Sequence, residues 1–341
     1  MSLRFATTGI GSLPHEDIGV ACQLILDCCT IPFWPQFPRL AFEQGMVAQF
    51  TEGFPALRFD PQRERIWVDR YDVDAITRFY EICTDGASIP ISPGWATGFG
   101  AMEGFLADLR LPVIKGHVTG PLTFTLGIKD NNGRYIYYDE ELREIALMLL
   151  VAKARWQIQA LGRFADRVIV FIDEPMLSAL GSSTYLGVST EDASSLLRRM
   201  IQDIKAAGAM TAIHCCGNAD WEMVFDTGVD IVNFDAYAYF DALNLYHERI
   251  AQHISGGGFL AWGIVPTLTI DDIRQENADS IAAKFTERFE RLAVNVGLET
   301  LAAHSLLTPS CGAGLLDVEM AEKVFYILKW LRHYLTKRFG G

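Results

Sequence analysis

Short, continuously apolar segments alternate with longer helix-forming segments along this chain. Continuous apolar strands are typical of a parallel sheet that helices cover on both faces. We expect strands at 5–10, 111–118, 167–172, 210–213, 231–234, 259–265 and 301–307. A further strand end is expected within 30–38, where several prolines exclude a helix interior. About eight strand–helix units predict one α/β domain over 1–341, a (β/α)8 TIM barrel with small insertions.

The main competing architecture is a doubly wound open sheet. The Gly-rich phosphate fingerprint that usually follows the first strand of that fold is absent from this sequence. Alternating apolar and charged residues at 57–68 predict a hairpin that is inserted into the barrel. Continuous helices are expected at 42–51 and 242–254, and Ser189 is expected to cap a helix that ends near Ala207.

Nearly every predicted strand ends at a Gly, Pro, Asp, His or Cys residue. In a TIM barrel the C-terminal ends of all strands meet on one face, which is where the active sites of this fold lie. The polar residues expected on that face are Ser12, Gln36, His117, Asp173, Glu174, His214, Cys216, Asp235 and Cys311. The sequence therefore predicts a functional site that is built from side chains far apart along the chain.

His214 and Cys216 follow the apolar segment 210–213 and indicate a metal site. Side chains alternate along an extended chain, so these two residues point to the same side. Imidazole and thiolate are ligands that suit zinc, and Cys311 and Asp235, each at another strand end, would complete a set of four ligands. Two thiolates bring a bound zinc ion close to neutrality, which favours holding a thiolate substrate over activating water for hydrolysis.

The remaining cysteines are interpreted as core residues. The seven cysteines are an odd number in a long chain and do not form the pattern of a secreted disulfide framework. Cys215 points away from its two neighbours on the strand and is expected to pack in the core. Cys22, Cys28, Cys29 and Cys83 lie in apolar, helix-like surroundings and are expected to be buried.

Five short motifs at predicted strand ends carry a resemblance to a known family. They are Ile-Gly-Ser at 10–12, Val-Thr-Gly-Pro at 118–121, Ile-Asp-Glu-Pro at 172–175, His-Cys-Cys-Gly-Asn at 214–218 and Pro-Ser-Cys-Gly at 309–312. With these motifs in this order, nearly the whole chain resembles the catalytic half of cobalamin-independent methionine synthase. It is also similar to the corrinoid-dependent zinc methyltransferases of the uroporphyrinogen decarboxylase superfamily.

The resemblance implies that zinc is bound by His214, Cys216 and Cys311. The synthases have a Glu at the strand end that corresponds to Asp235. Asp is one methylene shorter, so either it still ligates the metal or the fourth position is left to substrate or water. The resemblance also implies that Asp173 holds the amino group of homocysteine.

Five residues around this centre are further candidates for the site. The resemblance implies that Ser12 contacts the carboxylate of homocysteine, and turn chemistry is the alternative. Gln36 lies near a position where the synthases carry another amino-binding residue. Asp173 and Glu174 either bind substrate, cap the following helix or pair with a barrel Arg. His117 is either a catalytic residue or a core histidine.

The sequence thus predicts a zinc-dependent transfer of a methyl group to a thiol, with homocysteine as the first choice of acceptor and methionine as the product. The synthases have a His beside the strand that matches 262–266, which helps to protonate methylfolate, and this chain has none there. A methylcorrinoid donor, either methylcobalamin or a corrinoid protein, needs no such proton and is favoured over methyltetrahydrofolate.

Two other functions remain as alternatives. A uroporphyrinogen decarboxylase-like enzyme needs Arg residues in the first loop to hold several carboxylates, and the loop 11–17 has none. A non-catalytic zinc-binding or corrinoid-partner module would keep the site without the chemistry. The net charge of −13 argues against nucleic acid and anionic membrane surfaces as partners. The absence of an apolar run of transmembrane length and of a signal peptide predicts a cytoplasmic protein.

Overall fold

Parallel strands form the centre of the computed structural model, which describes residues 3–181, 185 and 187–339. One curved sheet contains seven strands in the order β1-β10-β9-β8-β7-β6-β4, and every neighbouring pair is parallel. The strands are β1 Ala6–Thr7, β4 Leu111–Thr119, β6 Ala165–Asp173, β7 Met210–Cys215, β8 Ile231–Phe234, β9 Phe259–Val265 and β10 Ser305–Pro309. This order follows the chain, as a barrel requires.

The segment 31–36 joins the two edges of this sheet. Phe33 forms a parallel bridge to Lys115 of β4, and Gln36 forms a parallel bridge to Ser12, which follows β1. The segment therefore takes the place of the eighth strand, although only isolated bridges hold it. The predicted (β/α)8 TIM-barrel fold is confirmed, and the strand expected within 30–38 is the one that closes the ring.

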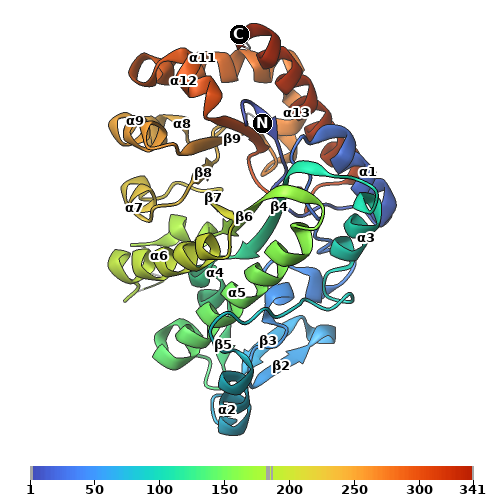
Figure 1. The fold of residues 1–341 in the computed structure, drawn as a ribbon, viewed down its shortest axis with the longest axis vertical. Coiled ribbons are helices and arrows are strands. Elements are labelled where there is room, and N and C mark those ends of the chain that lie inside the picture. The colour runs from blue at the N-terminus through green and yellow to red at the C-terminus, as the bar shows by residue number, and fades with distance from the viewer. Residues whose placement is uncertain (1–2, 182–184, 186, 340–341) are drawn as a thin grey trace.

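Helices surround the sheet on its outer side (Figure 1). They are α1 Ile18–Cys28, α3 Thr97–Leu106, α4 Pro121–Gly127, α5 Glu140–Leu161, α6 Thr190–Ala206, α7 Trp221–Asp226, α8 Phe240–Asn244, α9 His247–Ser255, α10 Ile270–Gln275, α11 Ala278–Val296, α12 Leu298–Ala303 and α13 Val318–Phe339. The expected cap is confirmed, because the Ser189 side chain accepts the Asp192 amide at the start of α6. None of the described helices combines the length and apolar character needed to cross a membrane.

A small subdomain is inserted between the segment 31–36 and α3. Its strands β2 Leu57–Asp60 and β3 Arg65–Val68 form the predicted antiparallel hairpin, and β5 Lys129–Asp130 pairs with β3. Helix α2, Val73–Ile82, also belongs to it. Because the insertion leaves the barrel at the C-terminal end of the segment 31–36, it lies on the side of the strand ends (Figure 1).

Three predicted elements differ from the observed ones. The helix expected at 42–51 is two 3-10 helices, Phe42–Gln44 and Ala48–Thr51, since Gly45 between them has an extended backbone. The helix expected at 242–254 is divided into α8 and α9. The strand expected at 301–307 begins only at Ser305, because α12 contains the preceding apolar residues. A short apolar run does not by itself distinguish a strand from a buried helix.

Candidate metal centre

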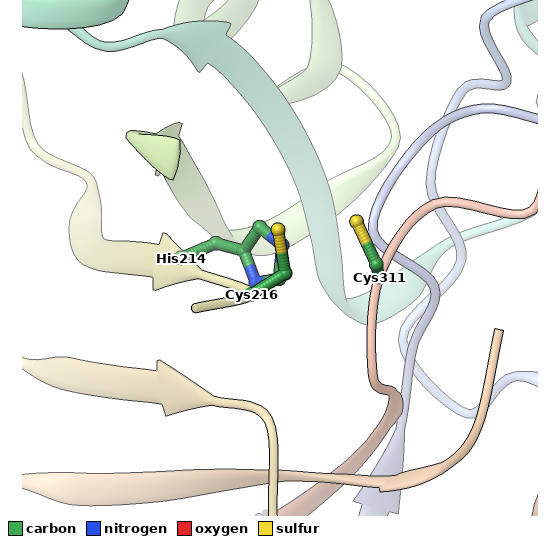
Figure 2. A group of neighbouring side chains, drawn as sticks. All are labelled: His214, Cys216 and Cys311. Carbon is green, nitrogen blue, oxygen red and sulfur yellow. The ribbon is translucent and has the colours of Figure 1, made fainter. Parts of the chain in front are cut away.

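His214, Cys216 and Cys311 come together at the C-terminal end of the barrel. One ligand atom from each lies within 4.8 Å of the others, which is a group that could hold a metal ion. His214 is the penultimate residue of β7 and Cys216 follows that strand, whereas Cys311 lies in the loop after β10. Figure 2 shows the first two side chains at the end of β7, with Cys311 approaching from the other loop. Strands β8 and β9 separate β7 from β10, so the curvature of the sheet creates the group.

The hydrogen bonds of Asn233 determine which nitrogen of His214 is free. Asn233 lies beside His214 on β8, and its Nδ2 donates to the carbonyl oxygen of Ala261 at 2.8 Å and to Thr308 Oγ1 at 2.9 Å. A carbonyl oxygen can only accept, so Asn233 Oδ1 must be the atom that faces His214 Nδ1 at 2.6 Å. Nδ1 therefore carries the proton, and the lone pair of the imidazole lies on Nε2.

His214 Nε2 is buried and has no hydrogen-bond partner among the described residues. A buried polar atom without a partner is uncommon and needs an explanation. The unprotonated nitrogen lies with two cysteine sulfurs, and this donor set is typical of zinc. The residues present thus fit a zinc ion with three protein ligands.

We expect Asn233→Leu to weaken zinc binding by about 10–100-fold, as is typical when the group that orients a ligating His is removed. The leucine side chain cannot accept a hydrogen bond from His214 Nδ1–H. The tautomer that leaves Nε2 free for the metal is then no longer favoured. Competition with a chromophoric chelator would measure the affinity. Asn233→Asp is the control, because it keeps an acceptor for Nδ1 and should cost less. An affinity of Asn233→Leu within twofold of the wild type would refute the role of Asn233.

The two cysteines of the group affect each other's pKa. The hydrogen bond from Cys311, followed by the effect of His214, lowers the pKa of Cys216 to about 4. The Cys216 thiolate in turn raises the pKa of Cys311, and burial acts in the same direction. A lowered thiol pKa suits metal binding, because the thiolate is the ligating form of cysteine. Cys215 is fully buried and turned away, as predicted, and its sulfur faces the carbonyl oxygen of Gly217.

A cavity of about 250 Å³ lies over the three ligands. It is also lined by Ser12, Gln36 and Asp173, so the structure brings these predicted substrate-binding residues to the same cavity as the candidate metal ligands. Ser12 Oγ accepts the amide of Gly314 at 3.2 Å, which leaves the hydroxyl hydrogen available for a ligand. A Cβ at Gly312 would collide with the Ser12 hydroxyl, which explains the glycine directly after Cys311.

Asp173 presents a carboxylate oxygen without a protein partner. It is the last residue of β6 and is paired in register with His214. Its Oδ1 is buried and receives no hydrogen bond from the described residues. Burial raises the pKa of Asp173 to about 6, and Lys115 acts against this increase. Lys115 is itself fully buried inside the barrel, where its Nζ donates to the carbonyl oxygen of Ile10 at 2.5 Å.

Glu174 has a structural role at the start of α4. Its carboxylate accepts the amides of Leu122 at 2.9 Å and Thr123 at 2.6 Å, as well as the Thr123 hydroxyl. It thus caps the helix that follows β4, and a Cβ at Gly120 would collide with it. Glu174 is not among the residues that line the cavity. Glu174 therefore caps a helix, although a different helix from the one expected.

Asp235 and His117 also lie outside the group of three ligands. Asp235 Oδ1 accepts the amide of Ala238 at 2.8 Å, and burial raises the pKa of Asp235 to about 6. His117 is fully buried against Trp34, with a centroid distance of 4.0 Å between the stacked rings. Both ring nitrogens of His117 lack partners among the described residues, and His117 does not line the cavity. Neither residue is among those that line the cavity or form the group of three candidate ligands.

Several residues that shape the site were not expected from sequence reasoning. Gln44 and Met46, from the insertion, line the cavity. Asn233 could have been noticed as the one polar residue in the strand Ile-Val-Asn-Phe, and Lys115 as a charge within an apolar strand. Gln44 and Met46 lie in a segment without a recognisable period, and no sequence signal connects them with the barrel.

Comparisons with known proteins add a structural relationship. No family model matches the chain, and no curated protein matches it. Among solved structures, the fold is similar to a B12-independent methionine synthase from Shewanella sp. W3-18-1 in complex with selenomethionine, with a TM-score of 0.62, 16% sequence identity and 99% of each chain covered. An E. coli 3-keto-D-glucoside 4-epimerase has a TM-score of 0.38 at 11% identity, covering 78% of this chain and 97% of that one, which is too low to bear on function. The first similarity supports a distant relationship between TIM barrels.

Proposed function

We propose that the protein transfers a methyl group to the sulfur of a small amino-acid thiol, homocysteine, at a zinc site formed by His214, Cys216 and Cys311. The observation that carries this proposal is a buried imidazole nitrogen without a partner, placed with two cysteine sulfurs at the floor of a cavity. The structural similarity to a methionine synthase that binds selenomethionine supports it.

The residues of the cavity suit an amino-acid thiol. A zinc ion bound there would lower the pKa of the acceptor thiol, so that the sulfur is held as a thiolate. Asp173 offers an acceptor for the ammonium group, and the Ser12 hydroxyl offers a donor for the carboxylate. Apolar residues, among them Ile10, Pro38 and Pro175, also line the cavity and would limit the water around the sulfur.

The donor proposed here is a methylcorrinoid, supplied as methylcobalamin or on a corrinoid protein. The methionine synthases have a proton-donating His beside the strand that matches β9, whereas the C-terminal end of β9 here consists of Gly263, Ile264 and Val265 and carries no proton donor. No Lys or Arg lines the cavity among the residues that the structure describes. A porphyrin with several carboxylates would need such cations, so the decarboxylase alternative has no support from the cavity.

X-ray absorption at the zinc edge would test the proposal directly. We expect purified protein to contain about one zinc ion per chain, and added homocysteine to replace a light ligand by one more sulfur. Homoserine, which has a hydroxyl in place of the thiol, is the matched control and should leave the sulfur count unchanged. Methionine formation would be followed in parallel with methylcobalamin and with methyltetrahydrofolate. A zinc spectrum unaffected by homocysteine, together with no methionine from either donor, would refute the proposed function.

A further inference from the structure

Two consecutive hydrogen bonds connect the cavity to the insertion. Gln36, on the segment that closes the barrel, donates from its Nε2 to Gln49 Oε1 at 2.7 Å. Gln49 lies in the second 3-10 helix of the insertion and donates from its own Nε2 to the carbonyl oxygen of Trp95 at 2.5 Å. Gln36 lines the cavity, whereas Gln49 is fully buried behind it.

The direction of both hydrogen bonds is determined by the Trp95 carbonyl group. The Trp95 carbonyl oxygen can only accept, so Gln49 must present its NH2 group to Trp95 and its Oε1 to Gln36. Gln36 must then use its NH2 group toward Gln49, which leaves Gln36 Oε1 as the free end. The orientation of the Gln36 amide is thus determined by a backbone carbonyl two hydrogen bonds away.

Gln36 Oε1 is held in place and has no protein donor. The backbone of Gln36 accepts the amide of Leu13 at 2.9 Å and donates to the carbonyl oxygen of Gly11 at 3.0 Å, which ties it to the first loop. A Cβ at Gly11 would lie 3.1 Å from Gln36 Oε1, so the glycine leaves room for the amide to approach this loop. No described residue donates a hydrogen bond to this oxygen.

We propose that Gln49 is a positioning residue that fixes Gln36 as a hydrogen-bond acceptor, so that Gln36 and Asp173 together bind the primary ammonium group of the acceptor. This inference rests on the proposed function and deepens it. It makes recognition of the ammonium group by Gln36 depend on Gln49, a residue of the insertion. Both Gln36 and Asp173 line the cavity, and Asp173 also has an oxygen without a partner. An ammonium group has three donors and no acceptor, which matches a pair of acceptors.

The inference defines a class of ligand. Amino acids with a free primary ammonium group should bind, and their analogues without nitrogen should bind much more weakly. Two acceptors side by side also disfavour a second carboxylate at this end of the cavity. The selectivity arises because an analogue without nitrogen leaves the oxygens of Gln36 and Asp173 without hydrogen-bond partners, which lowers its affinity.

Equilibrium binding would test the role of Gln49 without relying on methyl transfer. Titration calorimetry on the zinc-loaded protein would compare methionine with 4-(methylthio)butanoate, which lacks only the ammonium group. We expect the wild type to prefer methionine by about 100-fold, since a hydrogen bond to a charged group is strong and two are lost. Gln49→Met should weaken methionine binding by about tenfold and leave the analogue within about twofold, because the Gln36 amide becomes free to turn.

Four further variants separate positioning from a general loss of stability. Gln36→Met should show the same reduced preference, and the double variant Gln36→Met/Gln49→Met should be no worse than Gln36→Met alone, because Gln49 acts through Gln36. Gln49→Glu keeps an acceptor toward Gln36 and should restore the preference. Gln157→Met is the matched control, since Gln157 is an equally buried glutamine that bonds Trp34 and the His117 backbone instead.

The outcomes distinguish this inference from the proposed function. A methionine preference that is unchanged in Gln49→Met, or that falls equally in Gln157→Met, would overturn the role of Gln49. A wild type without preference for methionine over the analogue, but with methyl transfer to homocysteine, would overturn the ammonium site and leave the function intact. A preference that depends on Gln49 in a protein that transfers no methyl group would support the ammonium site and refute the function.

Discussion

We expect zinc affinity to fall by at least about 1000-fold when Cys216 is replaced by alanine, whereas the same change at the adjacent Cys215 should leave the affinity within about twofold. The difference arises because the two neighbouring side chains point in opposite directions. Cys216 lies within the group formed with His214 and Cys311, and the Cys215 sulfur faces the Gly217 carbonyl oxygen in the core. Metal analysis after dialysis, followed by chelator competition, would measure both variants.

Thermal unfolding provides the control for this pair. Cys215→Ala removes a buried sulfur and should lower the midpoint of unfolding, because it leaves a small cavity. Cys216→Ala removes a partly exposed sulfur, so it should lower the midpoint of unfolding of the metal-free protein less than Cys215→Ala does. Loss of zinc in both variants, or in neither, would refute the assignment of Cys216 as a ligand. Cys311→Ala should match Cys216→Ala in zinc affinity.

Asp173→Asn should lower kcat/KM for homocysteine by at least about 100-fold, the cost of removing one partner of a buried charged pair. The substitution replaces an acceptor by an NH2 group that faces the ammonium group of the substrate. It also removes the carboxylate that offsets the buried charge of Lys115. Initial rates at several homocysteine concentrations would separate an increase in KM from a decrease in kcat.

Two measurements restrict the interpretation of this result. The zinc content of Asp173→Asn should stay at the wild-type level, since Asp173 is not among the three candidate ligands. The rate with 4-mercaptobutanoate, which has no ammonium group, should change much less than the rate with homocysteine. An equal decrease for both thiols would contradict ammonium binding by Asp173 and would indicate a role at the sulfur instead.

The fold and the three candidate ligands were accessible from the sequence because both rest on short-range patterns. Continuous apolar strands that end in polar residues define a parallel barrel, and the shared face of the strand ends then brings His214, Cys216 and Cys311 together. The spacing of His214 and Cys216 on one strand needs no tertiary information. The strand at 31–36 was harder to delimit, because isolated bridges rather than a regular ladder hold it.

The roles of the other polar residues depend on contacts that the sequence does not encode locally. Glu174 directly follows Asp173, yet it turns to the amides at the start of α4 and leaves the cavity. Gln49 acquires its importance only when the insertion packs against the barrel and its amide meets Gln36. In both cases the deciding partner lies on a different strand–helix unit, and nothing in the spacing along the chain identifies it.

The arrangement of the candidate ligands has a consequence for how the protein matures. An unfolded chain offers His214 and Cys216 as neighbours, but Cys311 joins them only after β7, β8, β9 and β10 have paired in register. A chain that has not completed these pairings would hold zinc through two ligands and would lose it to competing chelators. Retained zinc would therefore report that the C-terminal half of the barrel has assembled, which makes metal content a measure of folding quality in a preparation.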